Sequence, residues 1–254
     1  MSNRSIRRKF GQNYLKDPVT ILKIENAINL KRGDNCLEIG PGRGSLTDFI
    51  INSEANVIAI DIDRNNIAHL KKKYSKHQVD LICGDVLKFD YSKLPKRLRV
   101  IGNLPYNIST QIIFNLISAA NRIEDMHCML QKEVAERICA SPGERNWGRL
   151  AIKTSLYFSS QILFNIEPNA FDIQPKVTSS FIRMTRLNKP LLKESDYANF
   201  SEFIDQCFVH KRKNIRNNLQ GYIKDWSITQ MTGNEKPEKI SLDNFISLFK
   251  ILRQ

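Results

Sequence analysis

Three of the eleven glycines in this chain fall in one short segment, Gly40-Pro41-Gly42-Arg43-Gly44. The segment follows the apolar run Cys36–Ile39 and precedes an amphipathic run, which is the pattern of a strand-to-helix turn. Glycines there allow a tight turn and a close approach of the backbone to a ligand. The spacing lacks the third glycine of a dinucleotide-binding turn, and no Gly-Lys-Ser/Thr of a P-loop follows. A nucleotide-type cofactor of another kind is therefore indicated.

Acidic residues accompany this turn and the ends of the next two predicted strands. Glu38 directly precedes the glycines, Asp61 ends the second predicted strand, and Asp85 follows the third. A carboxylate beside the turn disfavours a pyrophosphate and favours a cation, and an acid at the second strand end can bind a ribose diol. S-adenosylmethionine has a ribose, an adenine and a positive centre but no phosphate, so it fits this set. A structural alternative is that the glycines only turn the chain and the aspartates only cap helices. It would explain any one of these features taken alone.

The loop Gly102–Asn107 (GNLPYN) follows the fourth predicted strand and suits an exocyclic amine on a base. The lone pair of such a nitrogen is delocalised into the ring, so the amine is a poor nucleophile. The side-chain oxygen of Asn103 and the carbonyl of Leu104 can hold the amine hydrogens and aim the lone pair at a methyl group. Pro105 fixes the turn and Tyr106 offers a stacking face, so catalysis would rest on positioning rather than on a strong base. An ordinary Asn-x-Pro loop is the alternative.

Alternating β-rich and amphipathic runs must position these residues. From about residue 17 to 140 the alternation predicts an α/β fold with a doubly wound, mostly parallel sheet. The predicted strands are Cys36–Ile39, Val57–Ile60, Val79–Ile82, Arg99–Ile101 and Met126–Leu130. The predicted helices are Asp17–Asn29, Ser45–Ser53, Asp63–Tyr74, Ser109–Ala120 and Lys132–Ala140. Two late strands, Ser160–Ile166 and Thr178–Leu187, lack a helix between them and are expected to form an antiparallel pair.

The pattern changes after Asn188-Lys189-Pro190 to helical periodicity without strands. We expect helices at Tyr197–Phe208, His210–Ile223 and Leu242–Leu252. The predicted organisation is a cofactor-binding domain over residues 1–187, with a basic N-terminal arm, and a small helical domain over residues 188–254. A domain of that size gains little stability from its own core.

The composition limits the partners. In 254 residues, 39 Lys and Arg stand against 26 Asp and Glu, a formal net charge of +13 that favours nucleic acid first and an anionic membrane surface second. A hydrophobic content of 41% excludes wholesale disorder. No apolar run approaches the roughly 18 residues of a membrane span. The basic N-terminus is not followed by the apolar stretch of a signal peptide, so we expect a cytoplasmic protein with no membrane partner.

The five cysteines and four histidines are scattered, without a C-x-x-C pair or a metal-ligand spacing. We therefore expect no metal site, and cysteines that act as small buried hydrophobes in a reducing compartment.

Motifs in a fixed order extend over almost the whole chain. They resemble those of the ribosomal RNA adenine dimethyltransferases, the KsgA-type branch of the class I S-adenosylmethionine-dependent methyltransferases. The matching segments are Phe10–Leu15, Glu38–Gly42, Gly102–Ser109, Leu130–Val134, Ala170–Phe171 with Pro175–Val177 and Ser179, and Arg212–Lys213 with Arg216–Asn217.

The resemblance implies a class I methyltransferase sheet and a dimethylation reaction. Four methyl transfers would modify the N6 amines of two adjacent adenosines in the 3′-terminal hairpin of small-subunit (16S) rRNA. A monomer would act on the immature 30S particle and contribute to its assembly. A base in a hairpin must be splayed out to enter such a pocket, so two aromatic faces are reasonable. Phe171 would stack opposite the Asn103–Tyr106 loop. The cofactor would contact Asn13, Leu15, Gly40, Asp61, Asp85 and Asn103, beside Glu38 and Gly42 of the glycine turn.

The sequence departs from the family pattern at four positions. Asp61 stands where the family usually has Glu, which shortens the ribose contact by a methylene. Tyr14 replaces Phe, a change that we expect to matter little. Ile173 stands where Pro is common, and His210 stands where Gln is usual.

Two basic segments are candidate rRNA contacts. One is in the N-terminal arm. The other, within Lys211–Arg216, lies on one predicted helix, with Arg212 and Arg216 on a shared face. A solvated helix face is the usual explanation of a charge run, but phosphate binding is favoured beside an adenine-methylating site. The candidates are Arg7, Arg8, Lys9, Lys211, Arg212, Lys213 and Arg216.

Three other functions remain open. The related antibiotic-resistance methyltransferases modify one adenine in large-subunit rRNA, but segments Leu130–Val134 and Arg212–Asn217 favour the small-subunit enzyme. A non-enzymatic nucleic-acid-binding or assembly factor could reuse the fold, although the intact Asn103–Tyr106 loop argues against it. The glycine spacing and Glu38 disfavour a nicotinamide dehydrogenase.

Overall fold

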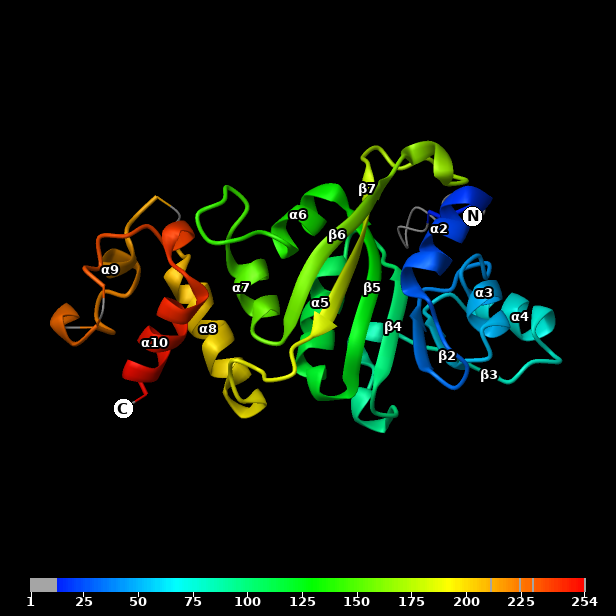
Figure 1. The fold of residues 1–254 in the computed structure, drawn as a ribbon, viewed down its shortest axis with the longest axis horizontal. Coiled ribbons are helices and arrows are strands. Elements are labelled where there is room, and N and C mark those ends of the chain that lie inside the picture. The colour runs from blue at the N-terminus through cyan, green and yellow to red at the C-terminus, as the bar shows by residue number, and fades with distance from the viewer. Residues whose placement is uncertain (1–12, 211, 224, 230, 254) are drawn as a thin grey trace. The chain divides into compact units, whose positions relative to one another are not determined.

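The computed structural model describes residues 13–253 except residues 211, 224 and 230. It contains two compact units (Figure 1). The first unit comprises the described residues up to Ala135 together with Gln161–Arg186, and the second comprises Glu136–Ser160 and the residues from Leu187 onward. Of the candidate rRNA contacts, Arg7, Arg8, Lys9 and Lys211 lie outside the described residues. No helix within these residues is long and apolar enough to cross a membrane.

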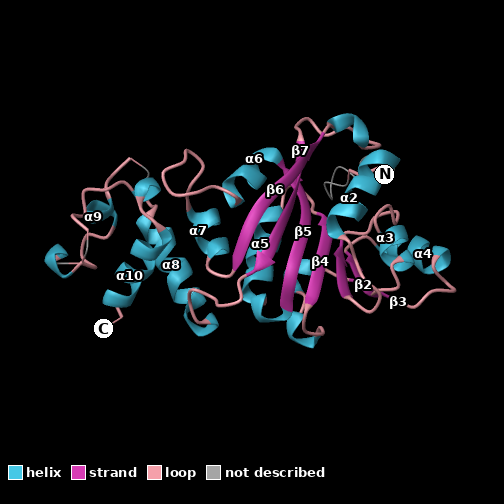
Figure 2. Cartoon of the chain, in the orientation of Figure 1, coloured by secondary structure: helices cyan, strands magenta, loops and turns pink. Residues whose placement is uncertain are grey.

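A seven-stranded sheet, drawn in magenta in Figure 2, dominates the first unit. Its strand order is β3-β2-β1-β4-β5-β7-β6. The first five strands pair in parallel, and β7 runs antiparallel to β5. These pairings confirm the expected mixed α/β sheet with a late antiparallel strand. The strands are β1 (Asn35–Ile39), β2 (Asn56–Asp61), β3 (Val79–Cys83), β4 (Leu98–Asn103), β5 (Ile123–Gln131), β6 (Phe158–Ile166) and β7 (Ser179–Arg186).

Helices precede, connect and follow the parallel strands, and side-chain caps fix where α2 and α4 begin. Pro18 opens α2, and the Asp17 side chain accepts a hydrogen bond from the Thr20 amide. Asp63 caps α4 in the same way by accepting from the Asn65 amide. The predicted helices are therefore present, with ends shifted by a few residues. They are α2 (Pro18–Ile28), α3 (Thr47–Asn52), α4 (Arg64–Lys73), α5 (Ser109–Ser118) and α6 (Lys132–Ile138).

The strand register brings the chemistry-bearing segments to one edge of the sheet. Ile39 of β1 pairs with Ile60 of β2 on one side and with Gly102 of β4 on the other. The connections leaving β1 and β4 go to opposite sides of this point, which is where α/β sheets bind ligands. The glycine turn, Asp61 and the GNLPYN loop consequently start from neighbouring strand ends.

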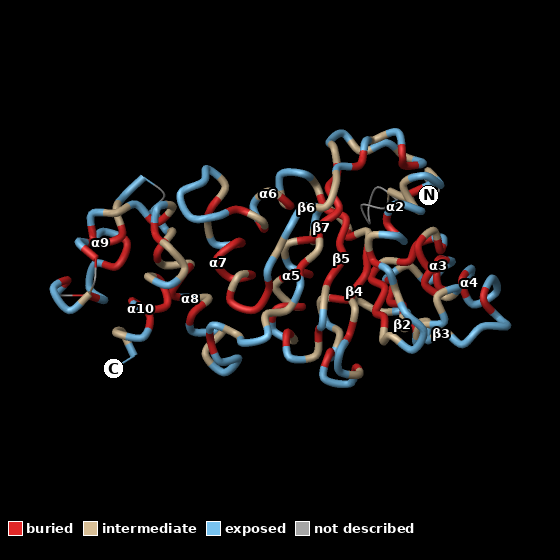
Figure 3. Tube along the Cα trace, viewed as in Figure 1, coloured by how far each residue is buried: buried red, intermediate tan, exposed pale blue. Residues whose placement is uncertain are grey.

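Buried residues, red in Figure 3, lie along the strands and on the helices beside them, and most of them are apolar. One buried cluster joins Ile24 and Ile28 of α2, Phe49 of α3, and Phe171 and Phe181 near the end of the sheet. The expectation of buried cysteines holds for Cys36, Cys128 and Cys207. It is wrong for Cys83, which is exposed, and Cys139 is half-buried. Cys83 ends β3, the edge strand of the sheet.

The second unit is helical, but its helices differ from those predicted. Tyr197–Phe208 and Leu242–Leu252 match α8 and α10, whereas α7 was not predicted. The predicted helix His210–Ile223 is wrong, because only a short helix forms there. Asn214 is its N-cap, and the Asn214 side chain accepts a hydrogen bond from the Asn217 amide. The preceding turn is held by Asn218, whose side-chain amide donates to the carbonyls of His210, Lys213 and Asn214. The helices are α7 (Arg149–Ser155), α8 (Tyr197–Cys207), α9 (Ile215–Asn218) and α10 (Leu242–Ile251).

The boundary between the units also differs from a single cut after residue 187. Residues 136–160 belong to the second unit because long-range polar contacts hold them there. Lys153 Nζ lies 2.9 Å from both carboxylate oxygens of Asp205 on α8. The Trp147 indole donates to the Ile240 carbonyl at 2.9 Å. Neither partner is close in sequence, so hydropathy patterning gave no signal for this grouping.

A buried arginine ties the amino end of β4 to its neighbours. The Arg99 guanidinium lies 2.9 Å from the Asp34 carboxylate and 2.8 Å from the Asp125 carboxylate. It also donates to the carbonyl of Ile28, the last residue of α2, at 2.9 Å. The side chains of Arg99 and Asp125 are each only 13% exposed. Removing the arginine would leave a nearly buried carboxylate without its cation.

We expect Arg99→Met to lower the free energy of unfolding by about 3–5 kcal/mol, because breaking a buried pair strands one charge. Urea denaturation followed by circular dichroism measures the loss. The matched control is Arg97→Met, since Arg97 pairs with Glu124 while its side chain is 83% exposed. Because solvent screens that exposed pair, its loss should change stability far less. Equal losses in the two variants would contradict the structural role of Arg99.

Candidate active site

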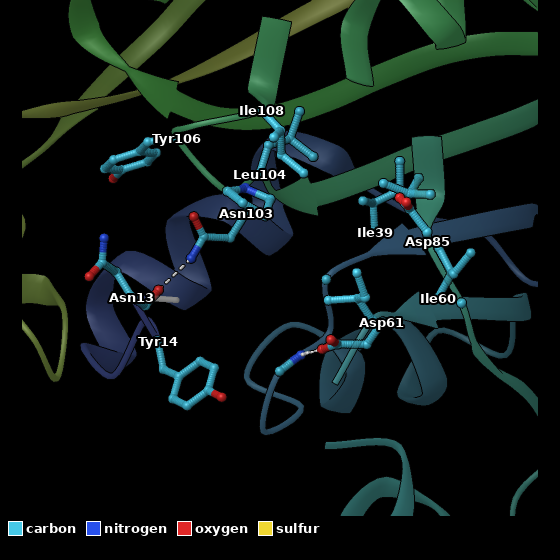
Figure 4. Close-up of a pocket in the computed structure, with 16 residues that line it drawn as sticks. Asn13, Tyr14, Ile39, Ile60, Asp61, Asp85, Asn103, Leu104, Tyr106 and Ile108 are labelled. Atoms are coloured by element: carbon cyan, nitrogen blue, oxygen red, sulfur yellow. Dashed lines mark hydrogen bonds between the residues drawn. The ribbon is translucent and has the colours of Figure 1, made fainter. Parts of the chain in front are cut away.

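A pocket lies at the carboxyl edge of the parallel strands (Figure 4). It encloses about 690 Å³ of empty space, counting the part open to solvent. Its lining residues are Asn13, Tyr14, Ile39, Gly40, Gly42, Ile60, Asp61, Ile62, Gly84, Asp85, Val86, Asn103, Leu104, Pro105, Tyr106 and Ile108.

The glycine turn forms one wall of the pocket. Gly40 and Gly42 have φ values of +70° and +57°, in the region that favours glycine. A Cβ on Gly42 would lie 2.6 Å from the Tyr14 ring, so the ring packs directly on the glycine backbone. The turn therefore has the positive φ values that glycine permits, and the Tyr14 ring is the group that approaches the Gly42 backbone closely.

Asp61 lies at the end of β2 and is held by three donors. Its Oδ2 accepts from the Gly42 amide at 3.2 Å and from the Asn66 side-chain amide at 2.9 Å, and its Oδ1 accepts from the Asp63 amide at 2.8 Å. The carboxyl is 6% exposed, and burial raises its pKa against the opposing effect of these hydrogen bonds. A carboxylate has about four acceptor sites, so capacity remains at Oδ1 for a ligand hydroxyl.

Asp85 lines the same pocket after β3. Its Oδ1 accepts from the Leu87 amide at 2.9 Å and so caps a short 3-10 helix at Val86–Lys88. The capping function offered as the structural alternative is thus present together with exposure to the pocket.

Asn103 ends β4 and faces the pocket with a fixed side chain. Its Nδ2 donates to the Asn13 carbonyl at 2.7 Å, the bond drawn as a dashed line in Figure 4. This bond uses the amide nitrogen and leaves Oδ1 as the group available to accept. The next residue, Leu104, is anchored through its own amide to the Met129 carbonyl at 3.2 Å.

Pro105 and Tyr106 continue the loop, and the Pro105 carbonyl accepts from the Ile108 amide at 3.1 Å. The Tyr106 hydroxyl and the hydroxyl of the buried Ser179 on β7 share a hydrogen bond of 2.5 Å. Burial raises the pKa of Tyr106, so its hydroxyl stays neutral near pH 7. The ring therefore has a fixed, uncharged anchor at its hydroxyl end.

Glu38 was expected to place a carboxylate that favours a cation beside the glycine turn, but its side chain is enclosed in the core. It is 1% exposed, does not line the pocket, and accepts from the Thr47 hydroxyl at 2.7 Å. Burial raises its pKa to about 8, so the side chain is mostly neutral at pH 7 and supplies no negative charge to a cation. The expectation that this carboxylate favours a cation in the pocket is wrong, because β1 lies inside the sheet between β2 and β4 and the Glu38 side chain is enclosed.

Leu15 and Phe171 also lie outside the pocket lining. The two residues form an isolated antiparallel bridge, and both side chains belong to the buried core. Phe171 is completely buried and presents no face to the pocket, so the predicted opposing stacking surface is absent from this conformation. Its role is to anchor the strap, the segment of residues 13–17, whose amides at Lys16 and Asp17 also donate to the Ala170 carbonyl.

The basic candidates that the structure describes lie in the second unit, where Arg212 and Lys213 are exposed. Arg216 is exposed too, but its guanidinium donates to the Thr232 carbonyl and lies 5.7 Å from the Trp226 ring. The expectation that Arg212 and Arg216 share a helix face is wrong, because α9 begins only at Ile215.

Sequence reasoning missed two polar residues of the site. Asn66, on α4, bridges Asp61 and the Tyr14 hydroxyl, which donates to its Oδ1 at 3.1 Å. Tyr14 had been expected to behave like the Phe of the family pattern. The only local signal was that departure itself, and nothing in the pattern connected it to Asn66.

The strand order, the reversed β7 and a glycine-turned pocket at the switch point define a class I methyltransferase. The model of the ribosomal RNA adenine dimethylase family matches residues 3–254. Two curated relatives are named ribosomal RNA small subunit methyltransferase A. The one from Pseudomonas putida is 40% identical over 95% of this chain and 93% of its own, and the one from Coxiella burnetii is 37% identical over 99% and 100%. The chain belongs to the ribosomal RNA adenine dimethylase family.

Solved structures agree with this assignment. A dimethyladenosine transferase from Plasmodium falciparum superposes with a TM-score of 0.75 at 28% identity, covering 92% of this chain and 95% of its own. The 23S rRNA methyltransferase ErmE superposes with a TM-score of 0.73, covering 95% and 100% of the two chains. At 24% identity, that second likeness concerns the fold alone.

The buried Glu38 predicts a specific pH dependence of stability. Its folded-state pKa of about 8 lies above its ordinary value of 4.5, so between these values the native state holds a proton that the unfolded chain has lost. Stability from this group is complete below pH 4.5 and declines as pH rises, by at most about 1.4 kcal/mol per pH unit. Glu38→Gln cannot ionise and should remove this slope.

The measurement is the urea midpoint of wild type and Glu38→Gln at intervals from pH 5 to 8.5. The variant should gain stability relative to wild type as pH rises. Glu25→Gln, at an exposed position of α2, is the matched control and should follow wild type at every pH. A constant difference between wild type and Glu38→Gln would show that Glu38 titrates normally.

Proposed function

We propose that this protein transfers methyl groups from S-adenosylmethionine to the N6 amines of two adjacent adenosines in the 3′-terminal hairpin of small-subunit rRNA. The products are N6,N6-dimethyladenosines. The observation that carries the proposal is the Asn103–Tyr106 loop, which presents fixed acceptors and a ring at the edge of the pocket. Family membership and the names of the curated relatives support the choice of substrate.

The donor set of the pocket fits S-adenosylmethionine. Asp61 keeps acceptor capacity for a ribose hydroxyl, and Asp85 offers a second carboxylate at the next strand end. The apolar side chains of Ile60, Ile62 and Val86 line the space near these acids and suit an adenine ring. None of the described lining residues is Lys or Arg, which agrees with a cofactor that carries no phosphate. The bound cofactor supplies an electrophilic methyl group on its sulfonium.

The chain's own residues then have to prepare the target amine. Asn103 Oδ1 accepts one amine hydrogen, because its Nδ2 is committed to the Asn13 carbonyl. The Leu104 carbonyl accepts the other, and the residue is anchored by the hydrogen bond that its backbone amide donates to the Met129 carbonyl. In the first transfer to each adenosine, holding both hydrogens draws the nitrogen towards tetrahedral geometry and exposes its lone pair. In the second transfer one hydrogen remains to be held. In both transfers the nitrogen releases one proton after attack. Tyr106 supports the base by stacking, and no general base is needed before attack.

The substrate partner in this proposal is rRNA in the immature 30S particle, bound by a monomer in the cytoplasm. Exposed Arg212 and Lys213 of the second unit are the described candidates for phosphate contacts. Arg216 is a weaker candidate, because its guanidinium already contacts Thr232 and Trp226. A contribution to small-subunit assembly can coexist with catalysis.

The alternatives have less support. Curated relatives of 37–40% identity are named for the small subunit, whereas the likeness to a 23S rRNA methyltransferase concerns the fold alone. A non-enzymatic assembly factor would not need Asn103 held with its oxygen free to accept.

The substrate can be tested directly. The protein is incubated with labelled S-adenosylmethionine and small subunits that lack the modification, and the label is mapped along the rRNA. We expect label at two adjacent adenosines of the 3′-terminal hairpin. Label on large-subunit rRNA would overturn the substrate assignment, and no label on either subunit would support the binding-protein alternative.

Asn103→Ala tests the chemistry. Loss of the acceptor that holds the amine should lower the rate of methyl transfer at least about 100-fold, as the loss of one preorganised polar group does elsewhere. The fold should survive, as checked by circular dichroism. Asn52→Ala, which removes the same group from an exposed position at the end of α3, is the matched control and should retain full activity. Retained activity in Asn103→Ala would refute this account of amine activation.

A further inference from the structure

Three polar side chains form a continuous hydrogen-bonded relay beside the pocket. The Tyr14 hydroxyl donates to Asn66 Oδ1 at 3.1 Å, and Asn66 Nδ2 donates to Asp61 Oδ2 at 2.9 Å. Asn66 is 1% exposed, so both ends of its amide are used within the protein. An amide with one acceptor and one donor end is the group that can join a hydroxyl donor to a carboxylate.

The relay meets the glycine turn at both of its ends. The Gly42 amide donates to the same Asp61 Oδ2, and the Tyr14 ring packs against the Gly42 backbone. Asp61 Oδ2 is thereby occupied by two donors, which turns the remaining capacity of Oδ1 towards the pocket. The orientation of the carboxylate therefore depends on Asn66 as well as on the backbone.

Tyr14 also connects the relay to the catalytic loop. Its neighbour Asn13 supplies the carbonyl that fixes the Asn103 side chain at 2.7 Å. The strap that carries both residues is held on its other side, where the Tyr14 amide donates to Asp172 Oδ1 at 3.0 Å and the Ser45 hydroxyl donates to the Leu15 carbonyl at 2.7 Å. One short segment thus supports both Asp61, which is proposed to hold the cofactor, and Asn103, which is proposed to hold the target amine.

We propose that Asn66 is a positioning residue, which orients Asp61 for the cofactor and ties Asp61 to Tyr14, so that cofactor affinity depends on the strap that also fixes Asn103. This inference rests on the proposed function, since the cofactor is the S-adenosylmethionine named there. It assigns a task to the hydroxyl by which Tyr14 differs from the Phe of the family pattern. It also offsets the shorter Asp61, because Asn66 holds that carboxylate in place.

The test measures binding of S-adenosylmethionine alone, by equilibrium dialysis, to wild type, Tyr14→Phe, Asn66→Ala and the double variant. Asn66→Ala should weaken binding about tenfold or more, the effect of one lost buried hydrogen bond to a charged group. Tyr14→Phe should weaken it by a smaller factor. The double variant should match Asn66→Ala, because without Asn66 the Tyr14 hydroxyl has lost the partner through which it acts. Asn65→Ala, at the exposed neighbouring position on α4, is the matched control and should bind like wild type.

A second readout separates positioning from a general loss of structure. Hydrogen bonding from Asn66 lowers the pKa of Asp61 against the raising effect of burial, so Asn66→Ala should raise that pKa further. The acid limb of cofactor binding should then move to higher pH in Asn66→Ala and little in Tyr14→Phe, which keeps the Asn66 bond. The other acids near Asp61 are Asp63 and Glu38; Glu38 stays protonated below about pH 8. A folded Asn66→Ala with an unmoved acid limb would overturn the relay.

The outcomes distinguish the two proposals. If wild type fails to bind S-adenosylmethionine, the proposed function itself is contradicted. If wild type binds S-adenosylmethionine and both Asn66→Ala and Tyr14→Phe bind it as tightly as wild type does, only the relay is contradicted. If Asn66→Ala does not fold, Tyr14→Phe decides, since Phe is the residue of the family pattern and keeps the ring on Gly42. Unchanged affinity in a folded Tyr14→Phe would then overturn the proposal.

Discussion

The parallel pairing of β1 with both β2 and β4 is the constraint on which the site depends. It brings the carboxyl ends of three strands to one edge and separates the connections that leave β1 and β4. The glycine turn, Asp61 and Asn103 are then neighbours, although they are far apart in sequence. The interior of the sheet imposes a second consequence, because a side chain on β1 is enclosed. Glu38 is therefore neutral near pH 7 rather than a counter-charge for a cation.

The strap adds what the sheet alone lacks. The end of each strand places its backbone and one side chain at the site, but it does not fix the rotamers of the Asn103 and Asp61 side chains. The Asn13 carbonyl fixes the first, and the Tyr14–Asn66 bond contributes to fixing the second. The bridge between Leu15 and Phe171 secures the strap to the core, which explains why an aromatic residue expected at the pocket is buried instead. The positions of the Asn103 and Asp61 side chains therefore depend on packing and hydrogen bonds from distant residues as well as on the local sequence motifs.

The second unit illustrates a different limit of local pattern. Residues 210–223 contain enough helix-forming residues to predict one helix, yet α9 spans four residues. Asn214 caps it late, and the amides of Ile215 and Arg216 donate to the carbonyls of Glu235 and Gly233 instead of continuing a helix. Such bonds to a distant loop outweigh helix propensity, which is a weak preference per residue. Arg216 is drawn towards Trp226 by the same contacts.

The sequence by itself determined the α/β alternation, the glycine turn, the acids at successive strand ends and the GNLPYN loop. These depend on side-chain periodicity and on backbone preferences of neighbouring residues, which a single stretch of chain carries. Only the tertiary structure decided the protonation of Glu38, the burial of Phe171, the short α9 and the partners of Tyr14. The partners of Tyr14 and Asn13 in the strap, for example, lie 52, 90 and 158 positions away in the sequence. Burial and hydrogen bonding over such separations are set by how the elements pack, and no local pattern records them.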